Sequence, residues 1–118
     1  MKTVRITTDD KIKVIDIPWN LEGWENAIGA DCTENVYTRI MYQLFLDRII
    51  MIVDGSEAAK HRPVNKVASY LYGAQEHGSY ICGDVLFARQ NGPDTVPLEN
   101  AELVKFFLKD HFRILEDE

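Results

Sequence analysis

Apolar and polar residues alternate in two short segments at the start of the chain, residues 2–7 and residues 12–17. Alternation with a period of two is typical of strands that are buried on one face. The polar residues 8–11 between them can form a turn, so we predict that a β-hairpin opens the fold.

The apolar residues that follow have a helical period. Asn20 can cap a short helix over residues 21–28, and Gly29 can end it in the left-handed conformation. Trp24 and Ile28 lie four residues apart, which places them on one face of this helix. We therefore expect both side chains to pack on the sheet.

Residues 31–61 allow two interpretations. After a polar connection over residues 31–34, residues 36–45 are rich in β-branched and aromatic side chains and residues 47–53 are mostly aliphatic. We predict a second pair of strands here, with a turn near Leu46 and Asp47. A helix over residues 37–47 is the alternative, because the apolar residues there also fit a helical period. Residues 56–61 are expected to form a surface loop.

The clearest local signals begin at Arg62. Pro63 disfavours helix at Arg62, and the side-chain oxygen of Asn65 can cap a helix that Gly73 would end. The face of this helix that we predict to be buried holds Val67, Tyr70 and Leu71.

The last third of the chain contains one apolar run and one amphipathic segment. Gly83 and Asp84 precede the continuous apolar run 85–88, which is typical of a strand buried in the core. A turn is expected within residues 90–97, and residues 100–112 are predicted to form a helix. Its predicted buried stripe consists of Leu103, Val104, Phe107, Leu108 and Phe112. We expect the acidic end, residues 116–118, to fray.

These elements follow the order β-β-α-β-β-α-β-α along residues 1–118. Hairpins interleaved with short helices predict an α+β domain with a mostly antiparallel sheet of about five strands and about three helices. A chain of 118 residues can bury one core but is too short for two, so we expect a single domain.

The charge of the chain narrows its possible partners. Its 13 Lys and Arg against 19 Asp and Glu give a formal net charge of −6, spread along the sequence. This charge opposes direct binding of nucleic acid or of an anionic membrane. No apolar run approaches the roughly 20 residues of a membrane helix, and the first residues lack the features of a signal peptide. We expect a cytoplasmic protein in which Cys32 and Cys82 are free, buried thiols.

The candidate ligand-binding residues are Lys60, Arg62, Asn65, Lys66 and Asp84. The three cations lie beside a predicted helix N-terminus, where an anion or phosphate can bind, but no glycine-rich phosphate loop accompanies them. Asn65 and Asp84 can equally serve the fold, as a helix cap and as an acceptor of backbone N–H groups. The three histidines lack metal-site spacing, and no serine has the context of a nucleophile. We therefore expect no catalytic residue, no metal and no cofactor.

The order of elements, together with the segments PVNKVASYLYG and ICGDVLF, resembles a bacterial and phage family catalogued as domain of unknown function 3846. The residues that carry this resemblance are Pro63, Val64, Asn65, Ala68, Leu71, Gly73, Ile81, Gly83, Asp84, Val85 and Leu86. Residues 31–46 depart most from the family. The family brings no known activity; the resemblance implies a context of phages, plasmids and conjugative elements.

These observations predict a small acidic binding protein that is not an enzyme and acts through a protein partner or as a homo-oligomer. Partly exposed aromatic side chains beside turns, at Trp19, Tyr72 and Tyr80, favour a protein interface. The resemblance adds an accessory or anti-defence role in a mobile element. The alternative is a small-molecule or nucleotide binder that uses residues 60–66 as an anion site.

Overall fold

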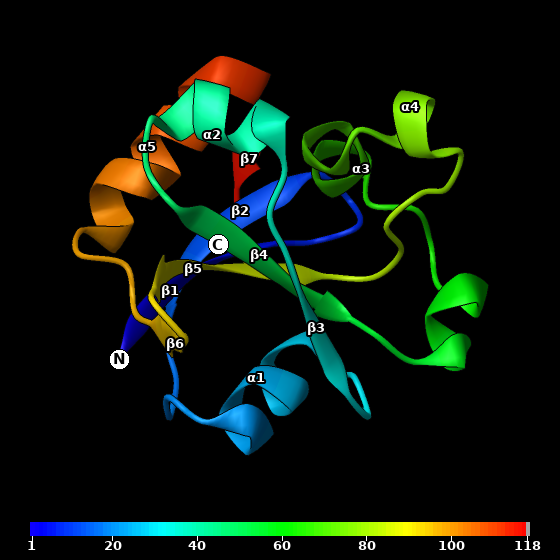
Figure 1. Ribbon diagram of the computed structural model, residues 1–118, viewed down its shortest axis with the longest axis horizontal. Helices are drawn as coiled ribbons and strands as arrows, with labels where there is room; N and C mark the ends of the chain where they lie inside the picture. Colours follow the sequence, from blue (N-terminus) through cyan, green and yellow to red (C-terminus); the bar gives the residue numbers. More distant parts are fainter. Residues whose placement is uncertain (118) are drawn as a thin grey trace.

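Seven strands form one mixed sheet with helices on both faces in the computed structural model, which describes residues 1–117 (Figure 1). The strands are β1 (Lys2–Ile6), β2 (Lys11–Asp16), β3 (Thr33–Val36), β4 (Ile49–Asp54), β5 (Val85–Asn91), β6 (Asp94–Val96) and β7 (Leu115–Glu116). The helices are α1 (Leu21–Ile28), α2 (Arg39–Phe45), α3 (Lys66–Tyr72), α4 (Ala74–His77) and α5 (Ala101–Phe112), with a 3-10 turn η1 (Glu57–His61).

The order of strands is β3-β4-β5-β1-β2-β7, and β6 pairs with β5. Every pairing is antiparallel except that of β2 with β7, so the predicted α+β class with a mostly antiparallel sheet is confirmed. The predicted numbers of about five strands and about three helices are too low. Three of the elements that the prediction missed are short. β6 has three residues, β7 has two and α4 has four.

The central strands β4 and β5 are apolar on both faces because helices cover both sides of the sheet. On one side Met51 and Phe87 belong to a core that α2, α3 and α5 cover. On the other side Ile52 and Leu86 pack with Ile28 of α1. The apolar run 85–88 is therefore a buried strand, as predicted.

The first third of the fold follows its sequence pattern. β1 and β2 form the predicted hairpin, in which Val4 pairs with Val14. The Asn20 side chain accepts a hydrogen bond from the Gly23 N–H (2.8 Å) and caps α1. Gly29 ends α1 in the left-handed region, with φ 69°.

Residues 39–45 form a helix, so the predicted strand over residues 36–45 is wrong and the helical alternative over residues 37–47 is confirmed. The second predicted strand, over residues 47–53, is confirmed as β4. Thr38 caps α2, because its Oγ1 accepts from the Met41 N–H (3.3 Å) and also donates to the Leu71 carbonyl (2.6 Å). The partner strand of β4 is β3, which begins inside the predicted polar connection. Residues 57–61, predicted as a surface loop, form η1.

The last helix buries fewer large side chains than predicted. Val104, Leu108 and Phe112 contact the core, whereas Leu103 is 62% exposed and Phe107 is 37% exposed. Tyr70 of α3, predicted to be buried, is also exposed.

Residues 116 and 117 of the acidic end form backbone contacts with β2, although we predicted fraying. β7 pairs with β2, and the Asp117 N–H donates to the Ile12 carbonyl (2.8 Å). Lys105 of α5 reaches Glu116 at 2.7 Å and so ties the helix to this strand. Glu118 lies outside the described residues.

Two further expectations concern burial and membranes. Cys32 and Cys82 are free thiols, but Cys32 is exposed and Cys82 is half-buried, so the prediction that both are buried is wrong. Among residues 1–117, no helix has the length and apolar character needed to cross a bilayer.

Candidate functional site

Asn65, the first of the candidate ligand-binding residues, is fully buried and serves the fold. Its Oδ1 accepts from the Ala68 N–H (3.1 Å), which caps α3 as predicted. Its Nδ2 donates to two backbone carbonyls, those of Ile6 (3.1 Å) and Gly83 (3.0 Å). One amide group thus joins α3, β1 and the start of β5, and both of its N–H groups are used.

Asp84 has a similar structural contact. Its Oδ1 accepts from the Thr8 N–H at 3.1 Å, which holds the turn of the β1–β2 hairpin against the start of β5. The predicted role of Asp84 as an acceptor of a backbone N–H group is confirmed. Asn65 and Asp84 therefore lie on either side of Gly83, but each is directed to backbone groups.

Arg62 forms an ion pair with Asp54, the last residue of β4. Its Nε lies 3.2 Å from Oδ2 of Asp54, whose side chain is only 1% exposed. Oδ1 of Asp54 accepts from the N–H and the hydroxyl of Ser56 (2.9 and 2.6 Å). Arg62 also donates to the carbonyls of Ile28 and Gly29 at the end of α1. Its guanidinium therefore neutralises a buried carboxylate and binds a helix C-terminus, where a cation is favourable.

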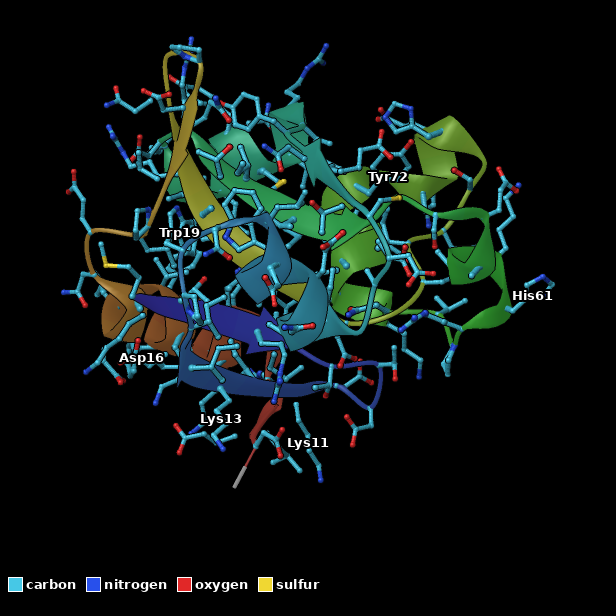
Figure 2. The ribbon with its side chains drawn as sticks, turned by 90° about the horizontal axis from the view of Figure 1, so that it is seen from below. Lys11, Lys13, Asp16, Trp19, His61 and Tyr72 are labelled. Carbon is cyan, nitrogen blue, oxygen red and sulfur yellow. The ribbon has the colours of Figure 1, made fainter. Side chains whose placement is uncertain are left out.

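The remaining cations of this segment face separate carboxylates. Lys60 lies 3.0 Å from Glu57 within η1, and Lys66 lies 4.0 Å from Asp10 in the turn of the first hairpin. Both lysine side chains are mostly exposed. His61 lies at the outer edge of the molecule (Figure 2). The three predicted anion-binding cations thus pair with carboxylates from three different elements.

The histidines and acidic residues show no metal-binding arrangement. Within residues 1–117, no group of three or more His, Cys, Asp or Glu side chains could hold a metal ion. His77 packs on the ring of Tyr72, with centroids 4.8 Å apart, and His111 stacks on Phe107 at 5.9 Å. These imidazoles lie against aromatic rings at the surface.

A second candidate site, which the sequence analysis missed, is an exposed apolar surface between α2 and α5. Leu46 is 77% exposed, Leu103 is 62% exposed and Phe106 is 67% exposed. We call this surface the α2–α5 apolar face and define it by Leu44, Phe45, Leu103, Phe106 and Phe107, together with Leu46, which directly follows Phe45 in the sequence. Figure 1 shows α2 and α5 next to each other on the same side of the sheet.

A groove of about 460 Å³ runs along the α2–α5 apolar face. Phe45, Ile49 and Val104 are among its apolar lining residues. Phe45 packs on Phe107 across the two helices, with ring centroids 5.6 Å apart. The charged residues that line the groove are Asp47, Arg89, Glu99 and Asp110.

A signal for this surface was present in the sequence. Each residue of a helix is rotated by about 100° from the previous one, so Phe106 and Leu108 lie about 200° apart and cannot both face the core. The apolar residues of α5 therefore cover more of its circumference than one buried stripe requires. Leu103 and Phe107, which we predicted to be buried, and Phe106 are all exposed.

Lys105 of α5 and its partner Glu116 have shifted pKa values. The hydrogen bond from Lys105 lowers the pKa of Glu116 below its ordinary value, and the nearby charges of Lys105 and Lys109 act in the same direction. The hydrogen bonds to Glu116 and Glu102 raise the pKa of Lys105. These groups link α5 to β7 and lie away from the apolar groove.

No protein-family model, curated protein or solved structure matches the chain. The resemblance to the family of domain of unknown function 3846 therefore stays a prediction.

Proposed function

We propose that this protein is a non-enzymatic binding protein that docks a protein partner on the α2–α5 apolar face. The observation that carries the proposal is the exposure of Leu103 and Phe106 in the wall of one apolar groove. Large apolar side chains that gather at the surface beside polar groups mark interaction sites, and aromatic residues are frequent anchors in them. The partner is another protein or another copy of the chain.

The backbone at Leu46 supports the same proposal. Leu46 is the C-cap of α2 and has φ 55°, in the left-handed region. A residue with a side chain costs about 1–2 kcal/mol more than glycine in this conformation. Because the Leu46 side chain is mostly exposed, it buries little apolar surface that could offset this strain. A strained, exposed leucine is favourable where a partner covers it, and strained residues often lie at functional sites.

The groove gives less support to the small-molecule alternative. Its volume of about 460 Å³ lies within the range of ligand pockets. Its polar groups do not converge on the interior, however, since Arg89 Nε lies 3.3 Å from Oδ2 of Asp47 and the two neutralise each other. Its walls include the exposed Leu103 and Phe106, so it is a surface groove.

The anion-binding version of the alternative uses Arg62, Lys60 and Lys66, each of which faces a carboxylate of the same chain. An anion would compete with those carboxylates for the same cations. An accessory or anti-defence role in a mobile element is an extension of the proposal that rests on the family resemblance alone.

The proposal is tested by replacing Phe106 with Asp and measuring capture of proteins from a lysate of the native host. The matched control is Tyr80→Asp, because Tyr80 is 68% exposed, close to the 67% of Phe106, but lies outside the groove. Phe106→Asp should remove the bound proteins while Tyr80→Asp retains them, and both variants should unfold at the same urea concentration as the wild type. Equal capture by all three proteins would contradict the proposal.

A further inference from the structure

The outer edge of β2 is paired over only part of its length. β7 pairs with Lys11 and Ile12, whereas β2 continues to Asp16. The Asp117 N–H donates to the Ile12 carbonyl, so the backbone groups of Ile12 face this edge. Because β2 is antiparallel to β1, alternate residues face the same neighbour, and the backbone groups of Val14 and Asp16 face this edge too. No strand in the described part of the chain pairs with them there.

The segment that covers the first part of this edge is held by its carboxylates. We call Leu115, Glu116 and Asp117 the β7 strap. Oε1 of Glu116 lies 2.7 Å from Nζ of Lys105 and 3.8 Å from Nζ of Lys109. Oδ2 of Asp117 lies 3.9 Å from Nη2 of Arg5. Ion pairs at a surface contribute little stability each, and the strap has only two residues in strand pairing, so it is weakly held.

Two further cations lie beside the strap on β2. Lys11 pairs with the first residue of β7, and Lys13 is the next residue on the same face of β2. Figure 2 shows both lysines on the side of β2 where β7 lies. Lys11 has Asp9 at 3.8 Å, whereas Lys13 is exposed and forms no ion pair among the described residues. A chain of net charge −6 thus presents cations along this edge.

We propose that the outer edge of β2 binds an extended acidic segment of another protein, which displaces the β7 strap and pairs with β2 along its length. The strap itself shows which ligand the edge accepts, because it is extended and acidic. An incoming strand would also satisfy the backbone groups of Val14 and Asp16, which the strap leaves unpaired. The inference goes beyond the proposed function, since it uses a surface different from the α2–α5 apolar face.

The positions of the cations fit acidic side chains on either face of such a strand. Successive residues of a strand point to opposite faces, and Glu116 accordingly reaches the lysines of α5 while Asp117 reaches Arg5. Arg5 pairs with Lys13 across β1 and β2, so these two cations share one face of the sheet. An acidic side chain of the incoming strand would therefore meet a cation whichever way it pointed.

The backbone of β2 favours a peptide over a nucleic acid as the ligand. A peptide strand brings both N–H and C=O groups, which match those of Val14 and Asp16, whereas a phosphate backbone brings acceptors only. The net charge of −6 also opposes the dense negative charge of a nucleic acid. Oligothymidylate is therefore the competitor ligand in the test.

The test measures binding of a labelled peptide to the full chain by fluorescence anisotropy. The peptide has about eight residues, an ordinary strand length, and alternates glutamate with threonine. Glu116→Arg places a third cation beside Lys105 and Lys109 and so releases the strap, which should raise the peptide affinity at least about threefold. The matched control is Glu102→Arg, which makes the same charge change 3.1 Å from Lys105 but leaves the carboxylates of the strap in place. It should bind the peptide nearly as the wild type does.

A second pair of variants tests the edge itself. Lys13→Glu, added to Glu116→Arg, replaces a free cation of the edge by an anion and should weaken peptide binding at least about tenfold. Lys60→Glu in the same background makes the same charge change at an exposed position on η1 and should have little effect.

Amide exchange followed by NMR locates the bound peptide without any substitution. In the wild type, saturating peptide should make the Asp117 amide exchange faster, because its bond to the Ile12 carbonyl is broken. The amides of Val14 and Asp16 should exchange more slowly, because they then pair with the peptide.

Four outcomes overturn the inference. The first is a peptide that does not bind Glu116→Arg at about 1 mM, and the second is a peptide that binds while the Asp117 amide keeps its protection. The third is equal affinity for a peptide with glutamine in place of glutamate. The fourth is tighter binding of an oligothymidylate of the same length, which would assign the edge to nucleic acid. None of these outcomes changes the test of the α2–α5 apolar face, which Phe106→Asp addresses by itself.

Discussion

Replacement of Asn65 by Ala should destabilise the protein by about 3 kcal/mol, because one side chain satisfies three backbone groups. Loss of the N-cap bond to Ala68 costs about 1 kcal/mol. Loss of the two Nδ2 donors leaves the buried carbonyls of Ile6 and Gly83 without these bonds, at about 1 kcal/mol or more each. A domain of this size is typically stable by about 5–15 kcal/mol, so the variant should still fold.

The matched control is Asn100→Ala. Asn100 caps α5 through one hydrogen bond to the Leu103 N–H (3.0 Å) and is exposed. Its replacement should therefore cost only the capping energy of about 1 kcal/mol. Urea unfolding of both variants, followed by circular dichroism with the slope compared, measures the difference directly. The expected difference of about 2 kcal/mol is the contribution of the two buried donors.

A second variant, Asn65→Asp, separates the cap from the donors. Aspartate is as good an N-cap as asparagine, but its second oxygen would face the two carbonyls that Nδ2 now contacts. We expect Asn65→Asp to be at least as destabilising as Asn65→Ala at neutral pH. If Asn65→Asp retained wild-type stability, or if Asn65→Ala cost no more than Asn100→Ala, the bridging role assigned to Asn65 would be refuted.

Three shorter predictions address other contacts. Arg62→Ala leaves the carboxylate of Asp54 buried without its cation and should cost about 2–3 kcal/mol in urea unfolding; a loss below about 0.5 kcal/mol would contradict the role of the ion pair. Leu46→Gly relieves a left-handed backbone and should raise stability by about 0.5–1 kcal/mol, measured in the same way; a loss would contradict the strain argument. The hydrogen bond from Lys105 lowers the pKa of Glu116, so its stabilisation should be complete above the ordinary carboxyl value of 4.5 and vanish as the pH falls through the lowered pKa. Glu116→Gln should therefore lose less stability than the wild type over this acid range; equal losses in an acid series of urea unfolding curves would refute the linkage.

The ion pair of Arg62 with Asp54 determines which variants can test anion binding by residues 60–66. Replacing Lys60 and Lys66 by Ala should cost at most about 1 kcal/mol each, since both are mostly exposed. Adding Arg62→Ala would combine loss of a possible anion ligand with loss of the contact to Asp54. The two lysines therefore give the cleaner variant for nucleotide-dependent thermal stabilisation. Unchanged stabilisation in that double variant would remove both lysines from any anion site.

Local signals in the sequence predicted the helix ends well. Asn20 and Asn65 each cap the helix that follows them, and Gly29 and Gly73 end theirs with positive φ, as predicted. Caps are predictable because the interacting groups lie within about three residues of each other. The hairpin of β1 and β2 was predictable for the same reason.

Distant contacts decided the elements that the sequence did not predict. The residues of α2 suit a strand or a helix, and the helix is stabilised in part by Thr38, which donates to the Leu71 carbonyl 33 residues away. β7 has only two residues, and its pairing depends on the free edge of β2. Local propensity does not predict contacts between residues that are distant in the sequence, and these contacts can override it.

Distant contacts also decided the environment of the cations that we predicted to bind an anion. Lys60, Arg62 and Lys66 are neighbours in the sequence, but their carboxylate partners come from η1, β4 and the first hairpin turn. Adjacency of cations in sequence therefore did not predict their electrostatic environment. The α2–α5 apolar face, in contrast, could have been anticipated from the angle of Phe106 on α5, although not the position of α2 beside it.

The candidate ligand-binding residues and the exposed apolar residues differ in what the fold explains, and this difference is the basis of the proposed function. Asn65, Arg62 and Asp84 direct their side chains to backbone groups or to a buried carboxylate, so the fold itself explains them. Phe106 and Leu46 are mostly exposed, and Leu46 has a strained backbone in addition, so stability of the monomer does not explain them. Exposed apolar residues that the monomer does not need are what the proposed partner would cover.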